Sequence, residues 1–209
     1  MNIQAQDKPV REVNPGSALS HVTMAQELAN YGYQHKDALS LLTAAQILVN
    51  TPVSALKIES KKSEGGTADK PKTEPVMADI LNPEKLVADA KIFGKDNPQI
   101  LALAGKITFD KSRGAVDGPN TGYDRVMAQG VDVYRIAFYG KSPAEVAVVG
   151  DGDTDLDLYV FDENGNLIGK DEDNTDRCYV AWMPQWTGSF IIKVINRGTV
   201  YNNYGIATN

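Results

Sequence analysis

The sequence predicts an α+β chain in two separate parts, a small N-terminal bundle or set of hairpins of helices and a C-terminal antiparallel β-sandwich. Two observations predict this. In the first hundred residues apolar side chains recur at steps of three and four, whereas from residue 131 they recur at steps of two. The later runs are also short, rich in β-branched and aromatic residues, and separated by Gly, Pro, Asn and Asp. We therefore expect an α-helical region over residues 1–105 and a β-sandwich over residues 106–209.

Four helices are expected in the N-terminal part. The stretches "SALSHVTMAQELAN" and "KDALSLLTAAQILVN" each place apolar residues on one helix face, and the short link between them implies an antiparallel pair. Ser17 or Ser20 can cap the first helix, and Gly32 suits the left-handed residue just past its end. Asn-Pro pairs at residues 82–83 and 97–98 mark two further helix starts, because asparagine caps a helix and proline fits its first turn.

The segment between the second and third helices has a different composition. Residues 59–75, "ESKKSEGGTADKPKTEP", contain no large apolar side chain. Such a segment cannot bury enough surface to order itself, so we expect a flexible linker or long loop. In the β part, Asn164-Gly165 separates two strand-like runs and predicts a hairpin.

Charge and composition exclude several classes of function. The net charge of −6 and the pI near 5.0 argue against nucleic acid as a partner. No run of eighteen apolar residues is present, so we expect no transmembrane segment, and the N-terminus does not have the pattern of a signal peptide. The lone Cys178 is expected to be packed in the interior. Both histidines, His21 and His35, lie in the helical part, which makes a catalytic triad within the β part impossible.

The β part also resembles a known family. It contains "DLDLYVFD", an Asn-Gly turn, an acidic loop, a Thr-Gly-aromatic strand, an Asn-Arg-Gly turn and a closing Asn-x-Tyr, preceded by a strand with a Tyr-Arg pair. In this order the elements resemble the bacterial pre-peptidase C-terminal domain family over residues 130–209. The resemblance implies a jelly-roll-like sandwich that serves secreted bacterial proteins as a non-catalytic accessory module. Some relatives bind calcium, collagen or polysaccharide. Because the family occurs in secreted proteins, the resemblance also implies a secreted, periplasmic or cell-envelope location.

Residues 150–176 hold ten carboxylates and a single lysine. In an extended backbone Asp151, Asp153 and Asp155 point to one side, and the leucines that follow point to the other. With Asp171 and Asp173 arriving from a neighbouring loop, these five carboxylates would suit Ca²⁺, which takes six to eight oxygen ligands in irregular geometry. The alternative is a set of turn-forming and edge-protecting aspartates without a metal.

Aromatic residues near the C-terminus suggest a ligand site. Trp186, Tyr201 and Tyr204 could form an exposed platform on which sugars or peptide side chains stack. The alternative is that the rings fill the core, and we expect at least one of Trp182 and Trp186 to do so.

The sequence therefore favours a non-catalytic, extracytoplasmic binding module that Ca²⁺ stabilises and whose partner is a polysaccharide or a protein. It specifies neither the ligand nor the oligomeric state. The alternative is a hydrolase, associated with peptidase or glycosidase activity, whose carboxylate site lies between the two parts. Two close carboxylates with divergent pKa values in a cleft would favour that alternative. A plain scaffold protein of the cell envelope is the third possibility.

Overall fold

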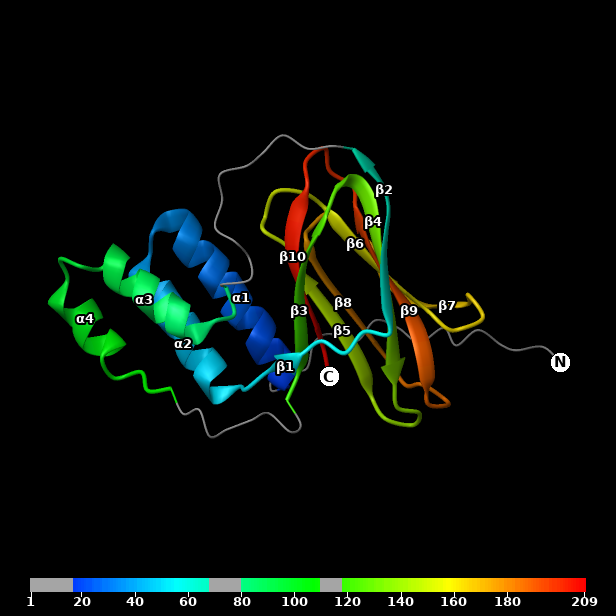
Figure 1. Ribbon diagram of the computed structural model, residues 1–209, viewed down its shortest axis with the longest axis horizontal. Helices are drawn as coiled ribbons and strands as arrows, with labels where there is room; N and C mark the ends of the chain where they lie inside the picture. The colour runs from blue at the N-terminus through cyan, green and yellow to red at the C-terminus, as the bar shows by residue number, and fades with distance from the viewer. Residues whose placement is uncertain (1–16, 68–79, 110–117) are drawn as a thin grey trace.

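The computed structural model describes residues 17–67, 80–109 and 118–209. Helices gather on one side and two β-sheets on the other (Figure 1). This arrangement confirms the predicted fold class. None of the helices in the described ranges is both long and apolar enough to cross a membrane. The helices are α1 (Ala18–His35), α2 (Ala38–Asn50), α3 (Pro83–Phe93) and α4 (Pro98–Ala104).

The predicted helix starts are confirmed. The side chains of Ser17, Asn82 and Asn97 each accept a hydrogen bond from a backbone N–H in the first turn of α1, α3 and α4. The predicted end of α1 at Gly32 is wrong, because the helix continues to His35. Gly32 instead lets α2 approach, since a Cβ there would lie 2.6 Å from the Leu41 side chain.

The sandwich consists of two five-stranded sheets (Figure 1). Sheet A has the order β1-β3-β10-β5-β8 and sheet B the order β2-β4-β9-β6-β7. The described pairings are antiparallel except for that of β1 with β3. The strands are β1 (Ser54–Ala55), β2 (Ser60–Thr67), β3 (Asn120–Val126), β4 (Ala128–Phe138), β5 (Ala144–Val149), β6 (Leu156–Phe161), β7 (Leu167–Asp171), β8 (Arg177–Trp182), β9 (Gly188–Asn196) and β10 (Asn202–Thr208).

The core between the sheets follows the alternation of the strands. Leu156, Leu158 and Val160 of β6 are buried in it, as their spacing predicts. The predicted Asn-Gly hairpin is also confirmed, because Gly165 takes a φ of 83° in the turn between β6 and β7. Asp162 closes this turn by accepting the backbone N–H groups of Asn164 and Asn166.

The expected flexible linker is wrong over its first part. Ser60–Thr67 forms β2, which pairs with β4 from Ser60↔Arg135 to Thr67↔Ala128. An edge strand needs a backbone ladder and not apolar side chains, and Lys61 adds ion pairs to Asp124 and Asp132. The rest of the expected linker, residues 68–75, lies outside the described residues. Because β1 and β2 precede α3, the sandwich draws strands from both sides of residue 105.

Helix α1 joins the helices to the outer face of sheet A. Ala147, Tyr179 and Ala207 of that sheet belong to the same apolar cluster as the helical core. Three polar side chains of α1, spaced four residues apart, donate to three consecutive backbone carbonyls at the end of β5 and just after it. The pairs are Gln26 to Val149 at 2.7 Å, Asn30 to Gly150 at 2.8 Å and Gln34 to Asp151 at 3.2 Å.

Candidate functional site

The acidic loops do not have the extended geometry that the alternation predicts. Residues 150–155 form an irregular loop in which Gly152 has a φ of 89°, and β6 begins only at Leu156. The carboxylate of the buried Asp151 accepts the backbone and side-chain N–H groups of Asn203, both at 2.9 Å. Asp153 is exposed, and its backbone N–H donates to Asp151. The expectation that the alternating aspartates share one side is therefore wrong.

The aspartates of the neighbouring loop also serve the backbone. Asp171 accepts the N–H of Tyr179 at 2.8 Å. Asp173 accepts both the N–H and the hydroxyl of Thr175, which is the geometry of an Asx-turn. Both contacts match the alternative in which these carboxylates shape turns and hold neighbouring strands.

Asp155 differs from the other four predicted ligands. Its Oδ1 is buried and has no hydrogen-bond partner. Desolvation raises the pKa of this carboxyl, and the negative charges of Asp157 and Asp173 raise it further. Within the described ranges, no three His, Cys, Asp or Glu side chains are grouped so that they could hold a metal ion. The calcium site stays a prediction, with Asp155 as the ligand whose surroundings fit a cation best.

Two of the three predicted aromatic ligand residues lie in the interior. Tyr204 is fully buried, and its hydroxyl donates to Asp132 at 2.7 Å. Tyr201 is also buried, with the guanidinium of Arg125 4.0 Å from its ring centre. Their prediction as an exposed platform is therefore wrong. Trp182 packs in the core, as expected for at least one tryptophan, while Trp186 is 45% exposed.

The sequence interpretation missed the polar group in the core that holds Tyr204. Asp132 is 1% exposed and faces inward from β4. It accepts the hydroxyls of Tyr204 and Ser63, and the Lys61 ammonium lies 3.3 Å away. The signal was available, because the period of two in "VDVYRIAF" places this aspartate on the same face as Tyr134. Its oxygens are all partnered, so the group stabilises the attachment of β2 and does not offer a binding site.

Cys178 is packed in the interior. Its thiol is buried and donates to the backbone carbonyl of Leu156 at 3.1 Å. Burial, above all, raises the pKa of this thiol well above its usual range, which disfavours the nucleophilic thiolate. The prediction that Cys178 is a packed residue is confirmed.

A cavity of about 530 Å³ opens at one end of the sandwich, and we call it the loop-end cavity. It lies where the β1–β2 connection, the β4–β5 turn and the last residues of the chain meet. Its walls include Ile58, Ile136, Phe138 and Pro143, and its polar groups include Asn120.

Two exposed aromatic rings lie close to this cavity. Tyr139, which lines it, is 79% exposed. The neighbouring Gly140 is in direct contact with the backbone of Trp186, because a Cβ on it would lie 2.5 Å from the Trp186 carbonyl carbon. Of the three predicted aromatic ligand residues, Trp186 is thus the exposed one, and its backbone lies beside Gly140, next to the cavity-lining Tyr139.

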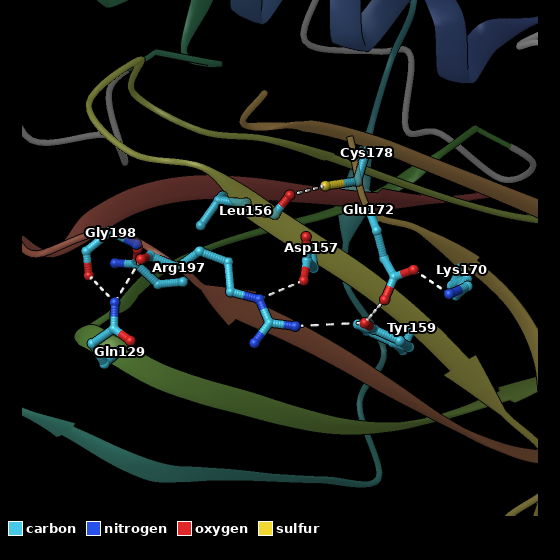
Figure 2. A network of polar contacts seen from close by, with 10 residues as sticks. Gln129, Leu156, Asp157, Tyr159, Lys170, Glu172, Cys178, Arg197 and Gly198 are labelled. Carbon is cyan, nitrogen blue, oxygen red and sulfur yellow. Dashed lines mark hydrogen bonds and ion pairs between the residues drawn. The ribbon is translucent and has the colours of Figure 1, made fainter. Parts of the chain in front are cut away.

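A second polar group lies on the outer face of sheet B, around strands β6 and β7 (Figure 2). Arg197 donates to the buried Asp157 at 2.6 Å, and this hydrogen bond, the largest effect, raises the pKa of the guanidinium. Figure 2 also shows Tyr159 donating to Glu172, which in turn pairs with Lys170. These contacts join β6, β7 and the residue after β9.

A small cavity of about 170 Å³ lies beside the contacts between α1 and the acidic loops, and we call it the junction cavity. Glu27 and Asp176 both line it. Burial raises the pKa of Glu27, although Arg177, 3.4 Å away, opposes this effect, and Asp176 adds to it.

No protein-family model matches the chain, and no curated protein matches it either. Among solved structures, it is similar to the pre-peptidase C-terminal domain of a collagenase from Bacillus anthracis, with 13% identity, a TM-score of 0.36, and coverage of 43% of this chain and 88% of that one. The Yersinia pseudotuberculosis-derived mitogen follows, with 17% identity, a TM-score of 0.33 and coverage of 44% and 85%. PliG of Aeromonas hydrophila, a periplasmic inhibitor of g-type lysozyme, has 18% identity, a TM-score of 0.30 and coverage of 49% and 91%. Membership in the pre-peptidase C-terminal domain family stays a prediction.

Proposed function

We propose that this chain is a non-catalytic binding module of an extracytoplasmic compartment and that it holds its ligand in the loop-end cavity. The observation that carries the proposal is the cavity itself. Its volume of about 530 Å³ lies within the range of roughly 300–1,000 Å³ that is usual for ligand sites. Apolar walls with a small number of polar groups are also typical of such sites.

The lining combines apolar side chains with neutral polar groups and with one charged residue of each sign, Lys57 and Glu59, so it carries no net charge and favours a neutral ligand with apolar faces. Ile136 and Phe138 provide apolar surface, while Asn120 and Ser142 provide an amide and a hydroxyl. A sugar ring has this chemistry, because its C–H faces stack on aromatic rings and its hydroxyls form hydrogen bonds. The exposed Tyr139 and Trp186 supply such rings nearby. A sugar residue of a polysaccharide is therefore the proposed ligand, and a side chain of a protein partner is the alternative.

A titration with soluble neutral oligosaccharides, followed by NMR or isothermal calorimetry, tests the proposal. Binding should weaken in Trp186→Ala and Tyr139→Ala, because each removes a stacking surface. Tyr31→Ala is the matched control, since Tyr31 is also an exposed aromatic residue but lies on α1. Equal loss in all three variants, or chemical-shift changes confined to residues away from the cavity, would contradict the assignment.

The proposal includes stabilisation by Ca²⁺ at the acidic loops. Its support is the buried and unpartnered Oδ1 of Asp155, whose surroundings already hold the charges of Asp157 and Asp173. A divalent cation beside this oxygen would offset both the desolvation and the repulsion.

The junction cavity supports a hydrolase as the second candidate. Glu27 and Asp176 face it from the two parts of the chain, and burial gives Glu27 a raised pKa, as a general acid requires. Hydrolysis of a panel of peptide and glycoside substrates, compared between the wild type and Glu27→Gln, separates the two functions. Turnover that disappears in Glu27→Gln would favour the hydrolase, and binding without turnover favours the module.

A further inference from the structure

The outer face of sheet B is a surface that the loop-end cavity does not explain. The helices pack on sheet A, so the outer face of sheet B is turned away from them (Figure 1). Its central strands β4, β9 and β6 nevertheless carry large apolar and aromatic side chains, all of which are partly exposed. These side chains are Val131, Val133, Tyr159, Phe161, Ile191 and Ile195.

The strand register places two cations in the same two cross-strand rows as two aromatic rings on this face. One cross-strand row runs Arg135↔Ile191↔Phe161, and the next runs Val133↔Lys193↔Tyr159. The rings of Tyr159 and Phe161 are nearly parallel, at 10°, with centres 6.2 Å apart. Adjacent strands lie about 4.8 Å apart, so Lys193 borders both rings, and its ammonium lies 5.2 Å from the centre of Phe161.

The charges of the face differ from those of the whole chain. The chain has a net charge of −6, but on this face bases outnumber acids. Lys62 pairs with Glu64 and Lys170 pairs with Glu172. Arg135 and Lys193 form no ion pair with any carboxylate among the described residues. The bases are Lys62, Arg135, Lys170, Lys193 and Arg197, and the acids are Glu64, Asp157 and Glu172.

This combination identifies the kind of partner that fits. A guanidinium matches a carboxylate with two parallel hydrogen bonds, and a neighbouring ammonium adds a second positive charge. The backbone groups of the central strands are used in the sheet ladders, so the face can recognise a partner only through side chains. An acidic peptide would gain more at an edge strand, where free backbone groups are available. A chain of sugar rings needs only stacking surfaces and charges.

We propose that the outer face of sheet B binds a carboxylated polysaccharide, whose sugar rings stack on Tyr159 and Phe161 and whose carboxylates pair with Arg135 and Lys193. The proposal concerns residues other than those that line the loop-end cavity. The two proposals can therefore be tested separately.

Affinity electrophoresis and calorimetry at low ionic strength, with polygalacturonate as the carboxylated probe and dextran as the neutral one, test the proposal. The wild type should bind polygalacturonate at this face, and any binding of dextran should be unaffected by the loss of Arg135 and Lys193. The affinity of the double variant Arg135→Gln/Lys193→Gln for polygalacturonate should be lower by a factor of about ten or more, because two charge-assisted hydrogen bonds are lost. Added salt should weaken wild-type binding through screening.

The matched control is Lys62→Gln/Lys170→Gln, which removes the same charge from paired cations of the same face. Its affinity should remain close to that of the wild type, and far-UV circular dichroism should show that all variants are folded.

Absence of wild-type binding to polygalacturonate would overturn the proposal. An equal loss of affinity in the control would also overturn it, because the attraction would then depend on charge alone. Tighter binding of polyglutamate than of polygalacturonate would overturn it as well. Loss of polygalacturonate binding in Trp186→Ala but not in Arg135→Gln/Lys193→Gln would assign the polymer to the loop-end cavity instead.

Discussion

The side-chain amide of Gln26 on α1 occupies the space where residue 205 of β10 would otherwise carry a side chain. A Cβ built on Gly205 would lie 2.8 Å from the Gln26 amide carbon. From this position Gln26 donates to the backbone carbonyl of Val149 at 2.7 Å. The helical part therefore docks on sheet A through a glycine that leaves room for a buried hydrogen bond.

Gly205→Ala is accordingly expected to destabilise the protein. The added methyl group must displace Gln26, and overpacking of this kind costs about 1–3 kcal/mol. The free energy of unfolding in urea measures the change. Gly105→Ala is the control, because the nearest atom to a Cβ there lies at 3.5 Å, an ordinary contact distance. Equal stability of Gly205→Ala and the wild type would show that α1 is not held at this position.

Asp162→Ala should weaken the β6–β7 hairpin. Asp162 is buried, which by itself raises its pKa, but hydrogen bonds from Asn166, Asn164 and Gly165 outweigh burial and leave the pKa below its usual value. Loss of this charged acceptor removes part-buried hydrogen bonds from Asn164 and Asn166, at a cost of about 1–3 kcal/mol.

The effect of Asp162→Ala should depend on pH. Because the folded-state pKa is lowered, the carboxylate contributes its full stability above the usual aspartate pKa of 3.8 and loses it as the pH falls through the folded-state value. Urea unfolding at pH 7 and at pH 2.5 should therefore show a large difference from the wild type at pH 7 and a smaller one at pH 2.5. A difference that does not change with pH would contradict this role of the ionised carboxylate.

Glu27→Gln should have the opposite pH dependence. The pKa of Glu27 is raised, chiefly by burial, so its neutral form is favoured in the folded state. Its contribution to stability is complete below the usual glutamate pKa of 4.5 and is lost as the pH rises through the folded-state value. Thermal melting should show Glu27→Gln to be more stable than the wild type at pH 7 and equally stable at pH 4. The control Glu163→Gln, in an exposed turn, should not be more stable than the wild type at pH 7.

Calcium should raise the thermal stability of the wild type if the acidic loops hold an ion. A ligand that binds only the folded state adds about 2.7 kcal/mol at a hundred times its dissociation constant. Thermal melts in CaCl₂ and in chelator, together with a calorimetric titration, measure this. Asp155→Asn should abolish the shift, whereas Glu163→Gln should keep it. A wild type that melts at the same temperature in both solutions would exclude calcium stabilisation.

The sequence alone determined the features that depend on neighbouring residues. The Asn82 and Asn97 caps, the turn at Asn164-Gly165 and the inward side chains of β6 were all predicted correctly. A cap or tight turn is formed by residues within four positions of one another, and the alternation of a strand follows from backbone geometry. These signals therefore need no knowledge of the rest of the fold.

The tertiary structure decided what depends on distant partners. Ser60–Thr67 becomes a strand only because β4 offers its edge, and Asp151 is buried because Asn203 donates to it. Tyr204, predicted as an exposed ring, is buried because Asp132 provides a buried acceptor for its hydroxyl. The loop-end cavity and the basic, aromatic face of sheet B likewise combine residues from strands far apart in the sequence. Which polar groups meet across such separations is set by the packing of the sheets, and local residue patterns carry no record of it.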